Sequence, residues 1–575
     1  MTKKGVEMSR ALITLSLIAM LGPTPFSQTS SPNPIESEAA KVDQIFAQWD
    51  KPDTPGCAVA VIKDGQVIHK HGYGQANLEL AVPITTSSVF NAGSIAKQFT
   101  AMSILLLAQD GKLSLDDEVK KHIPEFPDFG TSVTLRHLLH HTSGLRDFLE
   151  MLEMAGWRTG GDVTTEKDIL DMVSRQRTLN HKPGEEFVYT NTGYALLATI
   201  VKRVSGQSLP DYAETKIFKP LGMTSTHFYD DHRQIIKNLV DAYLPEKQRG
   251  YVKWVPASDY AGSSNLFTTV EDLARWDQNF YDRKVGGPAV VEQMLMPGTL
   301  NDGSKLDYAQ GLFVLTYKGL KTVIHSGSTL GYQGTLHRFP DQRFSVALLC
   351  NVRGTNPDGL ARRVADVYLV DHFKQVGSSS STSTVAPAET VVASAKELSN
   401  VAGLYLNPTS DVMRRLYVKD GKLFYFRAPG NESELSPLGD NRFLMIGVRN
   451  RVEISFQSAR ASTPLRMVIS ETGTKPTVWE RVKPASYQSQ ELVQFAGNYY
   501  SPELDTTYTI EPEGDKLLFR TGNWGNFLLS ARFTDSFANP EEMGSLMFTR
   551  NSNGRVSGFV IRSGKVRNLR FDKIK

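Results

Sequence analysis

A Ser/Thr-rich segment at residues 377–387 divides this 575-residue chain into two parts. Segments of this composition behave as linkers rather than as parts of a packed core. Beyond the segment, apolar and polar residues alternate in short stretches that are separated by turns such as Lys-Asp-Gly at residues 419–421. This pattern indicates antiparallel β structure. Because the chain is too long for a single core, we expect three or four domains.

The part of the chain after the linker contains an internal repeat. The pattern Ala-Gly-x-Tyr occurs at residues 402–405 and again at 496–499, and Lys-Leu occurs at 422–423 and again at 516–517. Both offsets are 94 residues, so one alignment without insertions fits both pairs. We therefore expect a linker at residues 376–394 and two small antiparallel β-barrels, at residues 395–484 and 489–575, each closing its own edges.

The first residues have the pattern of a secretory leader. Three basic residues precede an apolar run at residues 11–21, and a Ser/Thr/Pro-rich stretch follows. This run is too short to favour a permanent membrane span. We expect a signal peptide at residues 1–28, a mature protein without a stable membrane span, and a periplasmic or extracellular location. An uncleaved leader that acts as an anchor is the alternative.

The charge balance narrows the range of partners. Lys and Arg number 64 and Asp and Glu 61, which leaves a net charge of only +3. We therefore expect no nucleic-acid partner and no anionic membrane surface as a partner. The 12 His residues show no metal-ligand spacing such as His-Glu-x-x-His, so we expect neither a metal nor another cofactor.

Ser94 precedes an apolar stretch of helical spacing at residues 95–107. Lys97 follows three residues later and lies on the same face of the expected helix. Burial lowers the pKa of a lysine, which can then accept the proton of a serine hydroxyl. The amides at a helix N-terminus can also stabilise an oxyanion. Ser94 is thus a candidate nucleophile, the alternative being an N-cap serine beside a surface lysine.

Tyr189 and Asn191 are two residues apart, so an extended backbone would direct both to one side, ahead of a helix expected near Ala195. A phenol next to ammonium groups has a lowered pKa and can act as a base or proton shuttle. An asparagine can bind a substrate amide and the lysine together. The alternatives are a packed tyrosine and a turn asparagine.

His325 lies in an apolar strand that ends in small residues, including Gly327 and Ser328. A glycine allows a substrate backbone to lie against a strand. The Ser328 N–H could then be the second oxyanion donor beside that of Ser94. The alternative is a strand-edge histidine that a neighbour satisfies.

In this order, the three elements resemble the motifs of the penicillin-recognising serine hydrolases, the class C β-lactamase-like peptidases of family S12. Their motifs Ser-x-x-Lys, Tyr-x-Asn and Lys/His-x-Gly match Ser94/Lys97, Tyr189/Asn191 and His325/Gly327. The similarity spans about residues 35–373 and includes residues 133–145 and 261–266. The layout is most similar to that of D-aminopeptidase-type members, which carry two β-barrels after the catalytic domain.

This resemblance implies a fold for residues 35–375. We expect an α/β sandwich in which helices flank an antiparallel sheet, with an all-helical lobe inserted between residue 98 and about residue 259. The two lipocalin-like barrels follow. The catalytic serine would sit where the sheet meets the lobe.

The resemblance also implies roles for the candidate residues. Ser94 attacks an ester or amide carbonyl, and Lys97 with Tyr189 takes its proton. Tyr189 with His325 returns a proton to the leaving group, while Asn191, Gly327 and Ser328 bind the substrate. We expect the nearby His140, His141 and Ser143 to shape the site rather than to react.

His325 replaces the lysine of the Lys-Thr-Gly form of the third motif. A histidine is largely neutral near pH 7, so it suits a substrate carboxylate less well. The sequence therefore favours a secreted serine hydrolase that acts through a Ser94 acyl-enzyme on a small-molecule or peptide substrate, such as D-aminoacyl peptides or short-chain esters. The alternatives are a D-Ala-D-Ala carboxypeptidase or β-lactamase, a penicillin-binding sensor that acylates without turnover, and a ligand-binding protein with a vestigial hydrolase domain. No oligomeric state is predicted.

Cys57 begins one apolar strand and Cys350 ends another, and in the implied fold these strands lie side by side. A disulfide is conceivable there, but we expect two separately buried thiols. A Gly/Asn-rich segment at residues 522–526 is a candidate for a barrel loop that reaches the cleft. We favour instead a turn whose Trp524 packs within the barrel.

Overall fold

The computed structural model describes residues 37–373, except 159 and 255–256, and residues 393–574, except 409–411, 429–430, 449–450, 458–463, 472–475 and 540–543. The expected signal peptide at residues 1–28 lies outside the described residues, as do residues 376–392 of the expected linker. In the part of the chain that is described, no helix is long and apolar enough to cross a membrane.

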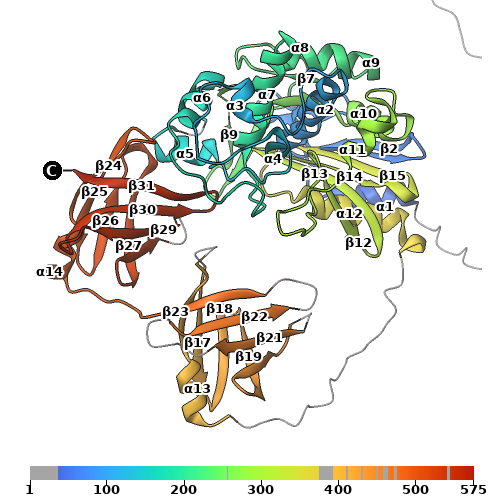
Figure 1. Cartoon of the computed structure of the whole chain (residues 1–575). Coiled ribbons are helices and arrows are strands. Elements are labelled where there is room, and N and C mark those ends of the chain that lie inside the picture. The colour runs from blue at the N-terminus through green and yellow to red at the C-terminus, as the bar shows by residue number, and fades with distance from the viewer. Residues whose placement is uncertain are drawn as a thin grey trace, which may run out of the picture.

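A six-stranded antiparallel sheet forms the centre of the N-terminal part (Figure 1). Its strands, in spatial order, are β12 (Phe313–Tyr317), β13 (Leu320–Thr329), β14 (Tyr332–Phe339), β15 (Phe344–Cys350), β1 (Cys57–Lys63) and β2 (Gln66–Tyr73). Successive side chains of a strand point to opposite faces. Accordingly, Ala58 and Ala60 of β1 belong to one apolar core, whereas Val59 and Val61 belong to another.

Helices cover both faces of this sheet. One face packs against α1 (Glu38–Phe46) and α12 (Pro357–Tyr368). The other packs against α2 (Ala96–Gln109) and α10 (Val270–Asp282), with α11 (Gly287–Met294) lying on α2. The expected α/β sandwich is therefore confirmed.

The segment between α2 and α10 forms a mainly helical lobe. Its helices are α3 (Val119–His122), α4 (Leu135–Leu139), α5 (Phe148–Met154), α6 (Glu166–Ser174), α7 (Asn191–Ser205), α8 (Leu209–Ala213), a π-helical turn (Glu214–Phe218) and α9 (Lys219–Leu221). The expectation of an all-helical lobe is wrong, because β8 (Ala242–Glu246) and β9 (Gly250–Trp254) form a hairpin within it and three two-residue strands also lie there.

Short strands complete this part of the molecule. They are β3 (Gln75–Asn77), β4 (Val82–Pro83), β5 (Phe90–Asn91), β6 (Thr164–Thr165), β7 (His227–Phe228), β10 (Ser258–Asp259) and β11 (Leu266–Thr268). The pairing of β5 with β11 and of β11 with β7 joins the start of the nucleophile segment to the lobe.

Two closed eight-stranded antiparallel barrels follow, as expected. Barrel 1 begins after α13 (Ala395–Val401) and consists of β16 (Gly403–Leu406), β17 (Met413–Lys419), β18 (Lys422–Ala428), β19 (Asn431–Gly439), β20 (Arg442–Met445), β21 (Val452–Gln457), β22 (Arg466–Glu471) and β23 (Thr477–Val482). Barrel 2 begins after α14 (Ser489–Leu492) and consists of β24 (Gly497–Ser501), β25 (Thr506–Glu513), β26 (Lys516–Arg520), β27 (Asn526–Phe533), β28 (Ser536–Asn539), β29 (Gly544–Arg550), β30 (Val556–Ser563) and β31 (Val566–Ile574).

The 94-residue repeat has a structural counterpart in the first strand of each barrel. Tyr405 and Tyr499 are both fully buried. Their hydroxyls donate to the carbonyls of Val401 (2.7 Å) and Phe495 (2.6 Å), each four residues upstream. A buried phenol needs such an acceptor, so the repeated tyrosine ties each barrel to the segment that precedes it.

Barrel 2 is joined to the lobe through a shared apolar core and a buried ion pair. Arg146 is fully buried, and its guanidinium donates to Glu503 (2.6 Å) and to the carbonyl of Arg567 (2.8 Å). Glu503 also accepts from the N–H of Arg177 (2.9 Å). Because removal of one partner would leave a buried charge uncompensated, this pair fixes the position of barrel 2 against the lobe.

Cys57 and Cys350 form a disulfide, so the expectation of two separate thiols is wrong. The antiparallel register of β1 and β15 sets the two residues directly opposite each other, with a Cα–Cα distance of 4.0 Å. The bond links β1 and β15, which are the first and last strands of the sheet along the chain, across 293 residues of sequence. Register depends on long-range pairing, which the sequence pattern alone does not define.

Replacing both cysteines by alanine should lower the free energy of unfolding by about 2–5 kcal/mol, because the bond closes a long loop in the unfolded chain. Denaturant unfolding of Cys57→Ala/Cys350→Ala and of the wild type, each with and without reductant, measures this loss. Reductant should affect only the wild type. Equal unfolding midpoints for the two proteins without reductant would contradict the prediction.

Candidate active site

Ser94 lies in a 3₁₀ turn at Gly93–Ile95 that leads directly into α2. The turn packs closely on β13. A Cβ at Gly93, whose φ is +54°, would lie 2.7 Å from the amide nitrogen of Ser328, and one at Gly327 would lie 1.8 Å from the carbonyl oxygen of Ala92. Only glycine fits at these two positions. The close approach sets the backbone of Ser94 beside that of Ser328.

Lys97 is fully buried behind Ser94. Its Nζ lies 3.0 Å from Ser94 Oγ, 2.9 Å from Asn191 Oδ1 and 2.8 Å from the carbonyl oxygen of Ser263. Burial lowers the pKa of Lys97 well below its usual range. The carboxylate of Asp147 opposes this shift, and the positive charge of Lys565 adds to it. The amine is therefore placed and tuned to accept the Ser94 proton.

Tyr189 lies over Lys97, with its ring centre 4.9 Å from Lys97 Nζ, and its hydroxyl bonds the Ser94 side chain. The expectation of a lowered pKa for Tyr189 is wrong. Burial raises this pKa above its usual value, the hydrogen bond to Ser94 lowers it in part, and the charge of Asp147 raises it further. Desolvation of the phenolate is thus the largest cause of the shift.

Asn191 is the first residue of α7, so this helix begins four residues earlier than expected. Thr190 caps the helix by accepting from the N–H of Thr192. Asp147 accepts from both the backbone N–H (2.6 Å) and the side-chain amide (3.1 Å) of Asn191. The amide nitrogen therefore faces Asp147, and the amide oxygen faces Lys97.

His325 is buried on β13, and its two ring nitrogens have different partners. Nδ1 lies 2.7 Å from the carbonyl oxygen of Ser326, which can only accept, so Nδ1 carries the proton. Nε2 then accepts from the hydroxyl of Tyr308 at 3.2 Å. Burial lowers the pKa of His325 to about 3, helped by the charge of Lys97. The ring is therefore neutral near pH 7, in line with the sequence expectation.

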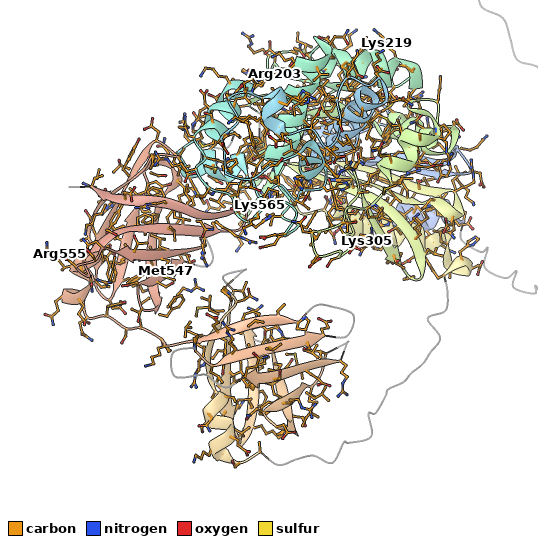
Figure 2. The ribbon with its side chains drawn as sticks, viewed as in Figure 1. Arg203, Lys219, Lys305, Met547, Arg555 and Lys565 are labelled. Atoms are coloured by element: carbon orange, nitrogen blue, oxygen red, sulfur yellow. A yellow bond between two sulfur atoms is a disulfide. The ribbon has the colours of Figure 1, made fainter. Side chains whose placement is uncertain are left out.

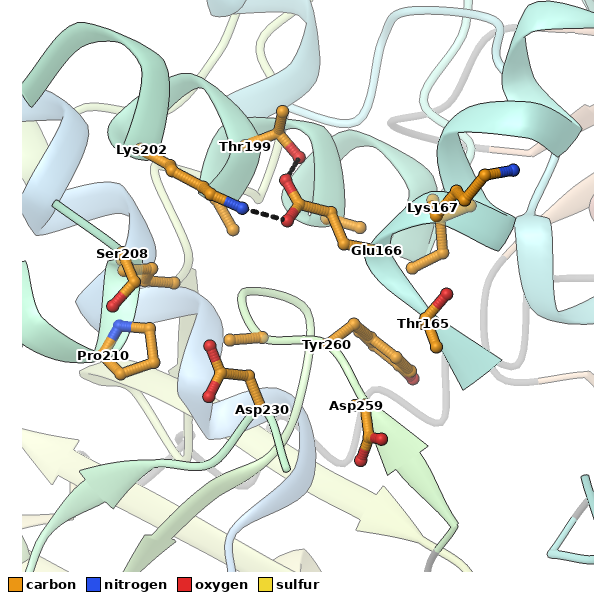
Figure 3. Close-up of a pocket in the computed structure, with 15 residues that line it drawn as sticks. Thr165, Glu166, Lys167, Thr199, Lys202, Ser208, Pro210, Asp230, Asp259 and Tyr260 are labelled. Atoms are coloured by element: carbon orange, nitrogen blue, oxygen red, sulfur yellow. Dashed lines mark hydrogen bonds and ion pairs between the residues drawn. The ribbon is translucent and has the colours of Figure 1, made fainter. Parts of the chain in front are cut away.

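The predicted residues surround one cleft. Six of the seven predicted site residues line a cavity of about 1150 Å³: Ser94, Tyr189, Asn191, His325, Gly327 and Ser328. The seventh, Lys97, lies directly behind Ser94. A second cavity, in the helical lobe, holds none of the seven (Figure 3). There Glu166 accepts from Thr199 (2.9 Å) and Lys202 (2.8 Å). The chemistry therefore belongs to the Ser94 cleft.

Lys565 is a cleft residue that sequence reasoning missed. It lies between β30 and β31 of barrel 2, where that barrel meets the catalytic part (Figure 2). It lines the cleft, and its Nζ lies 3.9 Å from Asp147 and 5.6 Å from the Tyr189 ring centre. Its carbonyl accepts from Asn180 (2.8 Å), which holds the loop in place. Barrel 2 thus contributes a side chain to the cleft.

The segment at residues 522–526, which the sequence suggested as a barrel loop that reaches the cleft, does not line the cleft. Trp524 packs against Tyr508 and Phe527, with ring centres 6.2 Å and 5.2 Å away. The favoured alternative, a packed turn, is therefore correct for residues 522–526. The Ser-Gly-Lys turn at residues 563–565 has the same appearance in sequence as the other turns of the barrel, so only its tertiary position distinguishes it.

His141 and Asp358 are further neighbours of the site; His141 was expected to shape it, whereas Asp358 had no predicted role. The His141 ring packs on Tyr189 with ring centres 4.3 Å apart, and its Nδ1 accepts from the N–H of Thr190 (3.2 Å). Asp358 of α12 lines the cleft and accepts from Ser326 Oγ (2.6 Å). Its other carboxylate oxygen is buried and has no hydrogen-bond partner among the residues that the structure describes.

Two characterised bacterial proteins are similar to this chain in sequence. Penicillin-binding protein 4* of Bacillus subtilis is 33% identical over 312 residues, which cover 51% of this chain and 67% of that protein. The D-aminopeptidase of Gluconobacter oxydans is 28% identical over 297 residues, which cover 52% of this chain and 56% of that enzyme. The matches thus span between about half and two thirds of these relatives.

Solved structures support the same fold. The octameric penicillin-binding protein homologue from Pyrococcus abyssi superposes with a TM-score of 0.51 at 24% identity, covering 77% of this chain and 99% of that one. The D-amino acid amidase from Ochrobactrum anthropi SV3 superposes with a TM-score of 0.50 at 22% identity, covering 58% of this chain and 99% of that one. At these identities, the likeness establishes the fold.

The family model described as Beta-lactamase matches residues 42–370, which include the whole sheet, the lobe and all seven predicted site residues. With the Ser-x-x-Lys, Tyr-x-Asn and His-x-Gly elements brought together around one cavity, the chain belongs to the β-lactamase-related family of penicillin-recognising serine hydrolases.

Proposed function

We propose that this protein is a secreted serine hydrolase that cleaves small amide or ester substrates, such as D-aminoacyl peptides or short-chain esters, through an acyl-enzyme at Ser94. The observation that carries the proposal is the 3.0 Å hydrogen bond between Ser94 and a buried Lys97 in a cleft whose His325 is neutral. The similarity to a D-aminopeptidase supports amides as the substrate class. The Cys57–Cys350 disulfide supports a periplasmic or extracellular location, because such bonds persist in oxidising compartments.

The pKa directions divide the proton-transfer roles. Burial favours the neutral amine of Lys97 and the neutral phenol of Tyr189. Lys97 therefore takes the proton as Ser94 Oγ attacks the carbonyl carbon. The N–H groups of Ser94 and Ser328 bind the oxyanion that forms. Tyr189 then gives its proton to the leaving group and regains one from Lys97, and water cleaves the acyl-enzyme.

Asp358 bears on which leaving groups the cleft accepts. In this mechanism the leaving group lies toward Tyr189 and His325, and Asp358 lines that end of the cleft. A leaving group that carries a carboxylate would meet the charge of Asp358 and find a neutral ring at His325. The unpartnered oxygen of Asp358 can instead accept from an amide or ammonium group. This disfavours D-Ala-D-Ala carboxypeptidase and β-lactamase activity.

Turnover by the mature protein should depend on Ser94. We expect hydrolysis of a D-alanyl anilide or a short-chain aryl ester, slower turnover of a chromogenic cephalosporin, and a loss of at least about 10³-fold in kcat/KM for Ser94→Ala, because the nucleophile is gone. Initial rates on the three substrates test this, with intact mass to detect an acyl adduct. A stable adduct without turnover would favour the sensor, and a Ser94-independent rate would overturn the proposal.

Substitution of Asp358 should change the preference among leaving groups. With one acyl group joined to glycine, glycinamide or ethylenediamine, Asp358→Asn should raise kcat/KM for the glycine compound about tenfold, because a charge repulsion is removed. The rate on glycinamide should stay within about twofold. Asp366→Asn, on the outer side of α12 beside Lys318, is the matched control. It should leave the kcat/KM ratios of the glycine and ethylenediamine compounds to the glycinamide compound unchanged. An unchanged glycine-to-glycinamide ratio in Asp358→Asn would contradict the prediction.

Loss of the Lys565 charge should shift the pH dependence. The charge of Lys565 lowers the pKa of Lys97, so Lys565→Met should raise the pKa of Lys97. The neutral amine of Lys97, which acts as the base, then forms only at higher pH. The acidic limb of the kcat/KM profile should move up by about 0.5–1 pH unit. Lys565→Arg keeps the charge and should restore the limb, and Lys516→Met elsewhere on barrel 2 should not move it. A limb that stays in place in Lys565→Met would show that this charge does not reach Lys97.

A further inference from the structure

A cavity between the two barrels concentrates positive charge. It has a volume of about 1250 Å³ and is lined by five arginines, two from barrel 1 and three from barrel 2: Arg414, Arg427, Arg532, Arg562 and Arg567. No Asp or Glu occurs among the described residues that line this inter-barrel cavity. Guanidinium groups remain charged at every physiological pH. Arg567 is already paired with Glu186 at 3.0 Å. The convergence of Arg414, Arg427 and Arg562 costs free energy unless a negative charge enters the cavity.

Three of these arginines bond only neutral groups among the residues of the described ranges. Arg414 donates to the carbonyl of Met413 (2.9 Å), Arg427 to the hydroxyl of Ser433 (3.1 Å), and Arg562 to the carbonyl of Pro408 (3.3 Å). The Nε of Arg414 is buried and lacks any partner within the described part of the chain. A buried, unpaired donor on a charged group is costly, and an anionic acceptor would remove that cost.

We propose that the inter-barrel cavity is a binding site for a ligand that carries two or more phosphate groups. The planar fork of a guanidinium matches phosphate oxygens in pairs, and several forks around one cavity suit several phosphates. Soluble polyphosphates, phosphate-bearing polymers and the two-phosphate headgroup of cardiolipin share this chemistry. The apolar residues of the lining, such as Val412 and Ala531, leave room for a non-phosphate part of the ligand.

The site is joined to the active-site cleft by three consecutive residues. Ser563 and Gly564 line the inter-barrel cavity, and Lys565 lines the cleft. A ligand that shifts the backbone of residues 563–564 would therefore shift the Lys565 amine relative to Asp147 and Tyr189. We expect occupancy of the cavity to change the KM or the acidic pH limb of the hydrolase.

Calorimetric titration of the full mature protein with sodium tripolyphosphate tests the site without reference to enzymatic activity. We expect one site per chain, and at least a tenfold weaker affinity for Arg414→Gln/Arg562→Gln. The control Arg415→Gln/Arg570→Gln removes the same charge from exposed positions on β17 and β31 and should bind as the wild type does. Absence of binding, or equal weakening of both double variants, would overturn the proposal.

Two further arms identify the ligand source and test the link to the cleft. Flotation with vesicles that contain cardiolipin, but not with pure phosphatidylcholine vesicles, would assign a lipid headgroup if Arg414→Gln/Arg562→Gln abolishes it. Binding of tripolyphosphate without flotation would assign a soluble or polymeric phosphate. On a substrate that shows Ser94-dependent turnover, saturating tripolyphosphate should change KM at least twofold in the wild type and not in Arg414→Gln/Arg562→Gln. An unchanged KM and pH limb would overturn the coupling while leaving the binding result intact.

Discussion

The rest of the site depends on the hydrogen bonds of the buried Lys97 amine. Its three neighbours come from three separate segments: Ser94 before α2, Asn191 at the start of α7, and the carbonyl of Ser263 before β11. An unpaired amine in that position would be costly to bury. The hydrogen bonds therefore tie the sheet-side turn to the helical lobe, and burial within them lowers the pKa that the chemistry needs.

Barrel 2 is part of the catalytic unit rather than an appended module. It shares an apolar core with the lobe, and the buried pair of Arg146 and Glu503 locks the contact. The same contact sets Lys565 beside Asp147, within electrostatic reach of Lys97. Barrel 1, by contrast, meets barrel 2 across an arginine-lined cavity. The two repeats have the same architecture but different neighbours: barrel 2 lies against the lobe and lines the cleft through Lys565, and both barrels line the arginine-rich cavity.

The motifs of the candidate site were recognisable in sequence because the chemistry depends on short-range spacing. Ser94 and Lys97 are one helical turn apart, and Gly327 is followed directly by Ser328, so local geometry alone relates them. The two barrels were recognisable because an exact 94-residue offset repeats both a buried tyrosine and a turn. Two expectations failed for different reasons. The pKa of Tyr189 follows from desolvation by the surrounding fold, and the hairpin of β8 and β9 is a local exception within the lobe.

The sequence by itself determined the α/β class of the first domain, the family, the seven candidate residues and the presence of two β-barrels. The barrels follow from the repeat and the turn pattern along the chain, and the candidate residues from motif spacing, whereas the α/β class and the family follow from the resemblance that these motifs carry. Only the tertiary structure decided that Cys57 pairs with Cys350, that Asp147 orients Asn191, and that Lys565 enters the cleft. Each of these joins segments far apart in sequence, through strand register or domain docking. Local propensity is silent on such contacts, because their geometry exists only once the core and the buried ion pair have formed.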